Sequence, residues 1–87
     1  MENKKILIID DERNIRMTLT YCLEAEGYTI DTAINGEEGL DILLNQKKKY
    51  DLILLDIKMP GKSGMEVLKE LRENENNSNV IMMTAYG

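Results

Sequence analysis

The sequence predicts an α/β fold in which one parallel sheet is covered by helices on both faces. Short continuous apolar runs, such as 5–10 and 51–56, are typical of strands buried on both sides. Segments with apolar residues at helical spacing lie between these runs. Strands that alternate with helices form doubly wound parallel sheets. Because the chain has 87 residues, we expect one small domain spanning 1–87.

The first half of the chain predicts two strands around one helix. The strands are the run 5–10 and the segment 28–33, which is rich in Tyr, Thr and Ile. A helix over 14–27 carries apolar residues at helical spacing: Ile15, Leu19, Cys22 and Leu23. Gly27 suits the left-handed conformation that often follows a helix. We expect the apolar stripe, including Cys22, to pack in the core.

The second half predicts two helix–strand pairs. Their elements are a helix over 35–46, a strand over 51–56, a helix over 63–74 and a strand over 80–84. Each helix begins with a capping residue three positions before a glutamate, at Asn35 and at Ser63. The polar stretch 45–49 is expected to be a loop. The apolar stripe of the second helix consists of Met65, Leu68 and Leu71.

Acidic residues end two of the predicted strands. Asp10 and Asp11 end the first strand, Asp56 ends the third, and Thr84 ends the fourth. With the common strand order 2-1-3-4, the first and third strands are neighbours and their carboxyl ends meet at one crevice. Two carboxylates about 4 Å apart repel by about 4 kcal/mol at an effective dielectric near 20. Mg²⁺, which favours oxygen ligands, would offset this repulsion.

Asp56 is the best candidate for covalent chemistry, because it ends the central strand and is expected to lie deepest in the crevice. An aspartate can form an acyl phosphate, and Mg²⁺ can neutralise charge on a phosphoryl group in transfer. The Thr84 hydroxyl could donate a hydrogen bond to a phosphoryl oxygen. The chain has no histidine and one cysteine, which excludes zinc sites and the usual Ser-His and Cys-His pairs.

Charge and hydropathy narrow the partners. The net charge is −5 and the isoelectric point is about 4.7, so direct binding to nucleic acid or to an anionic membrane is not expected. The N-terminal apolar run is too short for a signal peptide or a membrane span. A single cysteine cannot form an internal disulfide, which fits a reducing compartment. We therefore expect a cytoplasmic protein.

Three motifs together resemble the receiver domain of bacterial two-component response regulators. They are "DDE" after the first strand, "LLDIKMPGKSG" with its D-x-x-M-P-x-x-x-G spacing, and "MMTA" at the fourth strand. The ending "MTAYG" is most similar to receivers of NtrC-like activators. The resemblance implies a flavodoxin-like fold that continues through two more helices and a fifth strand beyond Gly87, so we expect a receiver truncated after strand four.

The resemblance also implies roles for individual residues. Asp56 matches the aspartate that accepts phosphate from a sensor histidine kinase. Asp11 matches the residue that binds Mg²⁺ directly, and Asp10 the one that helps to hold it, often through water. Lys58 matches the position whose backbone carbonyl binds the metal. Thr84 matches the hydroxyl that contacts the phosphoryl group. This implies a signalling module for transcription regulation, not an enzyme, with an output domain beyond Gly87.

Two alternatives stay open. The chain could be a phosphorylation-impaired fragment that acts only as a folding or dimerisation module, since the exposed edge of strand four favours a homodimer or a domain swap. It could also be an aspartyl phosphatase, which uses an aspartate nucleophile and Mg²⁺. Those enzymes usually place a second aspartate two residues after the nucleophile, where this chain has Lys58, so this hypothesis ranks last.

Overall fold

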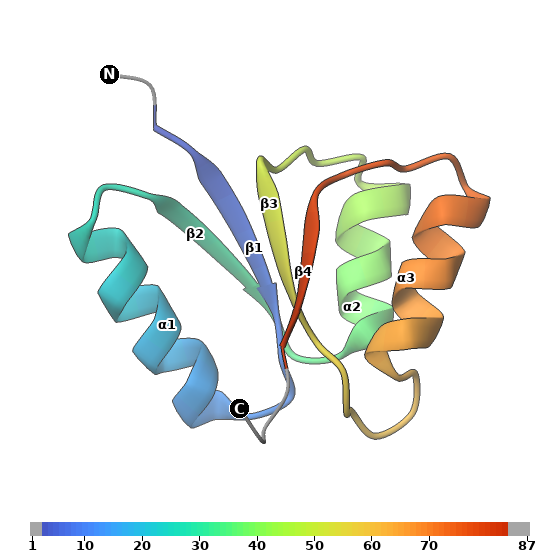
Figure 1. Ribbon diagram of the computed structural model, residues 1–87, viewed down its shortest axis with the longest axis horizontal. Coiled ribbons are helices and arrows are strands. Elements are labelled where there is room, and N and C mark those ends of the chain that lie inside the picture. Colours follow the sequence, from blue (N-terminus) through green and yellow to red (C-terminus); the bar gives the residue numbers. More distant parts are fainter. Residues whose placement is uncertain (1–2, 84–87) are drawn as a thin grey trace.

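The computed structural model of the chain describes residues 3–83. Within this range the elements are β1 (Lys5–Ile9), α1 (Arg13–Ala25), β2 (Thr29–Ala33), α2 (Gly36–Leu40), the π-helical turn η1 (Asp41–Asn45), β3 (Leu52–Asp56), α3 (Gly64–Glu73) and β4 (Val80–Met83). The strands form one parallel sheet in the order β2-β1-β3-β4 (Figure 1). The predicted fold class and strand order are therefore confirmed.

The main core lies between the sheet and helices α2 and α3. Side chains alternate along the central strands, so Leu7 and Ile9 of β1 and Ile53 and Leu55 of β3 point to this face and are fully buried. They pack against Leu40 of α2, Leu43 of the π-helical turn η1, and Val67 and Leu71 of α3. Burial of each such side chain contributes roughly 1.5–3 kcal/mol to folding.

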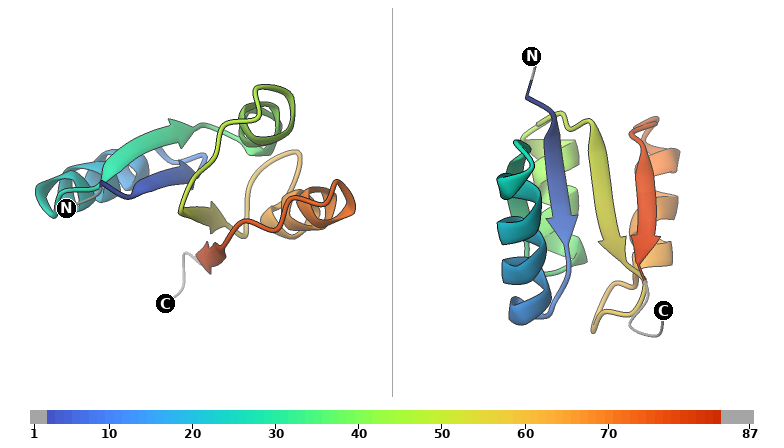
Figure 2. Two further views of the ribbon diagram at one scale, coloured as in Figure 1. Left: turned by 90° about the horizontal axis from the view of Figure 1, so that it is seen from above. Right: turned by 60° about the vertical axis from the view of Figure 1, so that its left-hand side comes forward.

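Of the helices within residues 3–83, α1 alone covers the opposite face of the sheet, and it covers only part of that face (Figure 2). Ile8 of β1 is fully buried on this side. Leu52 and Leu54 of β3 are half-buried, and Ile81 of β4 is 53% exposed. Figure 2 shows no helix of the described chain in front of β3 and β4 on this face. A groove of about 430 Å³ lies there, beside α1.

The partial cover corrects the expectation for α1. No residue of α1 is buried. Leu19 and Leu23 are half-buried, whereas Ile15 and Cys22 are exposed. The spacing correctly placed these four residues on one flank, but only part of that flank meets the sheet. The prediction that Cys22 is a core residue is wrong, because nothing in the described chain packs over that side of the helix.

The helix termini follow the sequence closely. Asn35 caps α2 by accepting a hydrogen bond from the Glu38 backbone N–H at 2.8 Å, and Gly27 follows α1 with φ +97°. The predicted helix 35–46 instead divides after Leu40. It continues as a π-helical turn in which the Gln46 N–H donates to the Asp41 carbonyl at 2.9 Å. The loop expected over 45–49 therefore begins after Asn45.

Of the three residues predicted for the apolar stripe of α3, Leu71 and Leu68 pack in or against the core and Met65 does not, while Val67 was not predicted. Val67 and Leu71, four residues apart, are fully buried, and Leu68 is half-buried. Met65, expected in the stripe, is 58% exposed. Val67 faces the core, where its side chain lies against Gly36 at the start of α2, and Met65 faces away from the core.

Candidate functional site

The three predicted carboxylates meet at the carboxyl edge of the sheet. Asp10 and Asp11 follow β1, Asp56 ends β3, and these strands are neighbours. One carboxylate oxygen from each residue lies within 4.8 Å of those of the other two. Asp10 is 4% exposed and Asp56 is 8% exposed, while Asp11 is exposed. Asp10, and not Asp56 as expected, is therefore the most buried of the three.

Three hydrogen bonds fix the position of Asp10. Its backbone N–H donates to the Ala33 carbonyl of β2 at 3.2 Å. Its Oδ1 accepts from the Glu12 N–H at 2.8 Å. Its backbone carbonyl accepts from Nη1 of Arg16, in α1, at 2.8 Å. Asp10 is thus held by partners from three segments, and sequence reasoning did not single out Arg16.

The loop that follows Asp56 and the neighbouring strand β4 hold Asp56 in place. Its Oδ1 accepts a hydrogen bond from the Lys58 N–H at 3.2 Å. In the sheet Asp56 pairs with Met83 of β4, and the Ile57 N–H donates to the Met83 carbonyl at 2.9 Å. Thr84 follows Met83 but lies outside the described residues. The role expected for the Lys58 carbonyl stays a prediction.

The environment of Asp56 disfavours its charged form. The pKa of its carboxyl is raised from 3.8 to about 6, first by burial and then by the negative charge of Asp10 and a hydrogen bond with Asp11. The Lys58 N–H opposes this shift in pKa. A cation among the three carboxylates would offset their repulsion, and all three offer the oxygen ligands that Mg²⁺ prefers. The donor set therefore fits the metal.

Met59 and Gly64 anchor the loop that follows Asp56, and Gly61 allows the loop to turn. Met59 is buried and packs in the core cluster. Gly61 adopts φ +77°, a left-handed conformation that favours glycine. At the end of the loop the Gly64 N–H donates to the Ile57 carbonyl at 2.9 Å. The Met-Pro-Gly sequence thus carries the chain back toward the end of β3.

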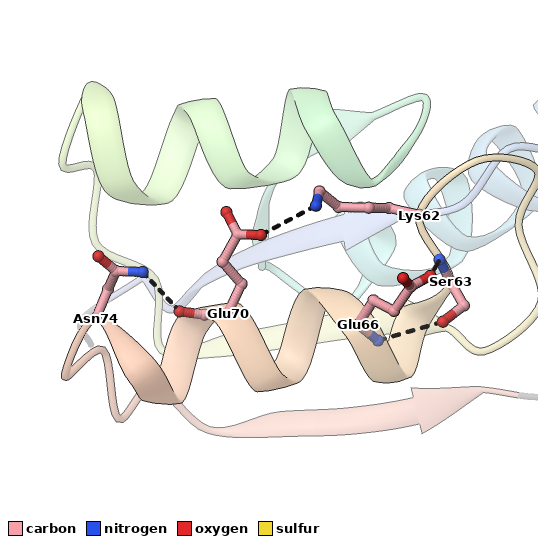
Figure 3. Close-up of polar contacts among 5 residues, drawn as sticks. All are labelled: Lys62, Ser63, Glu66, Glu70 and Asn74. Carbon is pink, nitrogen blue, oxygen red and sulfur yellow. Dashed lines mark hydrogen bonds and ion pairs between the residues drawn. The ribbon is translucent and has the colours of Figure 1, made fainter.

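Polar contacts fasten the far end of this loop to α3 (Figure 3). The Ser63 Oγ accepts from the Glu66 N–H at 3.2 Å, and the Glu66 carboxylate accepts from the Ser63 N–H at 2.9 Å. This is the predicted capping box, which is confirmed. Lys62 forms an ion pair with Glu70 at 3.0 Å, and Asn74 Nδ2 donates to the Glu70 carbonyl at 2.8 Å. The Lys62–Glu70 pair was not predicted.

Comparisons with known proteins agree with this geometry. The family model described as "Response regulator receiver domain" matches residues 6–87. Sporulation initiation phosphotransferase F of Bacillus subtilis is 47% identical over 87 residues, which is all of this chain and 68% of that protein. Transcriptional regulatory protein ResD of the same species is 48% identical over 83 residues, but the match spans only 33% of its length.

Solved structures give the same result. Response regulator TrrA of Thermotoga maritima, in complex with Mg²⁺-BeF, is 50% identical, with a TM-score of 0.85 over 97% of this chain and 71% of that one. A second structure, of histidine kinase ThkA in complex with TrrA, aligns with a TM-score of 0.86 at 50% identity over the same shares of both chains.

None of the helices within 3–83 has the length and apolar character needed to cross a membrane. The matching family, the parallel sheet in the order β2-β1-β3-β4 and the carboxylates at its edge all agree. This chain belongs to the response regulator receiver domain family.

Proposed function

We propose that the chain accepts a phosphoryl group on Asp56 in the presence of Mg²⁺. The observation that carries this proposal is the convergence of Asp10, Asp11 and Asp56, with one oxygen of each within 4.8 Å of the others. A buried carboxylate beside two others is unfavourable because its charge is unpaired. A divalent cation bound among the three carboxylates would offset that cost. The relative TrrA, with Mg²⁺-BeF in its complex, supports the choice of metal.

The proposed transfer makes one bond and breaks one. An Asp56 carboxylate oxygen attacks the phosphorus of a phosphohistidine, the P–N bond breaks, and the imidazole leaves with a proton from solvent. Asp10, Asp11, Asp56 and the Lys58 carbonyl would hold Mg²⁺, which when bound neutralises charge on the transferring group. The Thr84 hydroxyl would then donate to a phosphoryl oxygen. The attacking Asp56 must be ionised, and its pKa of about 6 permits this at neutral pH.

A sensor histidine kinase is the proposed donor, in keeping with the ThkA–TrrA complex. We place the reaction in the cytoplasm, and we place any transcriptional output in a domain outside residues 1–87. An acidic chain of net charge −5 is a poor ligand for nucleic acid by itself. The chain spans about a third of the length of ResD, which leaves room in that protein for such a domain.

Intact-mass spectrometry tests the proposal. The chain is incubated with acetyl phosphate and Mg²⁺, and one phosphoryl adduct is expected. Asp56→Asn should abolish the adduct, whereas Asp51→Asn, at the opposite end of β3 and exposed, should retain it. An equal adduct on Asp56→Asn would overturn the assignment. Turnover of a phosphomonoester by the wild-type chain would instead support the phosphatase alternative.

Self-association is a second candidate function. β4 is the last strand of the sheet, so its outer backbone N–H and C=O groups pair with no strand of the described chain. Ile81 on this strand is exposed, and Leu52 and Leu54 beside it line the uncovered groove. We propose that the β4 edges of two chains pair antiparallel about a twofold axis, because this symmetry lets both chains use the same edge in the interface.

Sedimentation over a range of concentrations tests this association. The wild-type chain should dimerise more strongly at high salt, because two chains of net charge −5 repel each other. Ile81→Lys should weaken the dimer. Met65→Lys changes the charge equally at an exposed apolar site on α3 and should not. A monomer at all concentrations, or equal effects of the two variants, would contradict the proposal.

A further inference from the structure

Helix α1 lacks the side-chain cap that α2 and α3 possess. Its N-cap residue, Glu12, makes no capping hydrogen bond with its side chain, whereas Asn35 and Ser63 cap the other two helices. The first turn of α1 is fastened in another way. The Arg16 guanidinium donates back to the Asp10 carbonyl at 2.8 Å, and the Arg16 N–H donates to the Glu12 carbonyl at 3.1 Å.

The Arg16–Asp10 bond connects the helix directly to the end of β1. The other two bonds to Asp10 come from Ala33 of β2 and from Glu12, within the turn itself. The Arg16 bond alone among these three involves a residue inside α1. Since Asp11 follows Asp10 in the chain, the position of this carbonyl also sets where the Asp11 side chain begins.

We propose that Arg16 is a positioning residue for the metal site, and that it holds Asp10 and Asp11 in place through the Asp10 carbonyl. The inference rests on the proposed function, in which these two residues bind Mg²⁺. Partners that orient metal ligands without touching the metal commonly change metal affinity by about 10- to 100-fold when removed. Arg16 would be such a partner, acting on the backbone of one ligand.

The sign of the effect separates positioning from charge. A positive side chain near a cation site repels the cation, so loss of its charge alone should strengthen Mg²⁺ binding. Loss of a positioning bond should weaken Mg²⁺ binding instead. Arg13 provides the matched control, because it lies one turn earlier on α1 and lines the same surface groove as Arg16. Within residues 3–83, Asp10 is hydrogen-bonded to Ala33, Glu12 and Arg16 but not to Arg13.

The experiment measures Mg²⁺ binding by isothermal titration calorimetry at neutral pH. Arg16→Met should raise the Kd about tenfold although it removes a positive charge. Arg16→Lys keeps the charge but not the planar guanidinium, and it should raise the Kd in the same direction. Arg13→Met should leave the Kd unchanged or lower it. A Kd for Arg16→Met equal to or below that of Arg13→Met would overturn the inference.

A metal-free measurement keeps the two proposals distinguishable. The Glu12 amide, which donates to Asp10 Oδ1, should exchange with solvent faster in Arg16→Met than in Arg13→Met or the wild type. Unchanged Glu12 exchange would count against Arg16 even if the Kd moved. If the wild-type chain bound no Mg²⁺, the proposed function would fail, whereas the exchange result would stand. If Arg16→Met does not fold by circular dichroism, Arg16→Lys carries both measurements.

Discussion

Gly64 lies directly against the backbone of Asp56. A Cβ atom placed on Gly64 would overlap the Asp56 carbonyl oxygen and would lie 2.9 Å from the Ile57 α-carbon. The start of α3 and the end of β3 therefore meet without a side chain between them. Because both neighbouring atoms belong to the backbone, neither can turn aside as a flexible side chain would. The loop that begins at Asp56 is closed by this contact.

Gly64→Ala should lower the free energy of unfolding by about 2–3 kcal/mol, because the added methyl group forces the backbone of β3 or α3 to move. Urea unfolding followed by circular dichroism measures the change. Met65→Ala, at the next and exposed position of α3, serves as the control and should change stability by about 0.5 kcal/mol or less. Equal stability of Gly64→Ala and the wild type would show that the contact is not as close as described.

Asp56→Asn should stabilise the metal-free protein at neutral pH and not in acid. The pKa of Asp56 is about 6 in the folded chain against 3.8 as its ordinary value, so the folded state binds the proton more tightly. This tighter proton binding contributes fully to the stability of the folded state below about pH 3.8, and the contribution is lost as the pH rises through about 6. The neutral amide avoids this loss, which amounts to about 3 kcal/mol.

Urea unfolding of Asp56→Asn and wild type across this pH range, with a metal chelator present, checks the sign. The gain in stability should appear between the two pKa values and should level off above the higher one. Asp51→Asn, which removes an exposed carboxylate from the other end of β3, should show no such gain. A stability difference for Asp56→Asn that did not vary with pH would contradict the raised pKa.

Ser63→Ala should destabilise the chain by about 1 kcal/mol, because the Glu66 N–H in the first turn of α3 loses its acceptor. The reciprocal bond from the Ser63 N–H to Glu66 survives this change. Thermal unfolding compares the variant with Lys69→Ala, an exposed substitution further along α3. A loss of stability no larger than that of Lys69→Ala would mean that the capping box adds little.

Tyr50→Phe should cost about 1 kcal/mol through loss of one hydrogen bond. The Tyr50 hydroxyl donates to Asp31 Oδ2 at 2.6 Å, which connects the segment before β3 to β2. Burial, together with this bond and the charge of Asp31, raises the pKa of the Tyr50 hydroxyl. Denaturant unfolding should show the loss, whereas Tyr21→Phe on the exposed side of α1 should be neutral. In an ultraviolet titration of the folded wild type, Tyr50 should ionise above the ordinary tyrosine pKa.

Much of the fold and the site could be predicted because it depends on local patterns. Apolar runs and helical spacing identify the strands and helices. Asn35 and Ser63 cap the helices through residues three positions away. The convergence of Asp10 and Asp56 follows from one further rule, that the carboxyl ends of neighbouring parallel strands lie at the same edge. None of these predictions depends on how closely the helices and the sheet pack together.

The burial of individual side chains depends on which surfaces of the helices and the sheet are in contact, and sequence periodicity does not predict those contacts. Cys22 has the spacing of a core residue, yet it is exposed because only part of its flank of α1 meets the sheet. Met65 and Val67 both have apolar side chains, and the orientation of α3 against α2 buries only Val67. Each outcome depends on contacts between elements that are distant in the chain.

The chemistry of the site divides in the same way. The identity and order of the residues specify a parallel sheet with Asp10, Asp11 and Asp56 at one edge. Short stretches of sequence suffice for this, because they determine both the alternation of strands with helices and the residues at which the strands end. Three-dimensional packing sets the burial that raises the pKa of Asp56, the bond from Arg16 to the Asp10 carbonyl and the contact of Gly64 with Asp56. These depend on distances of a few ångströms between separate elements, which exist only once the chain has folded.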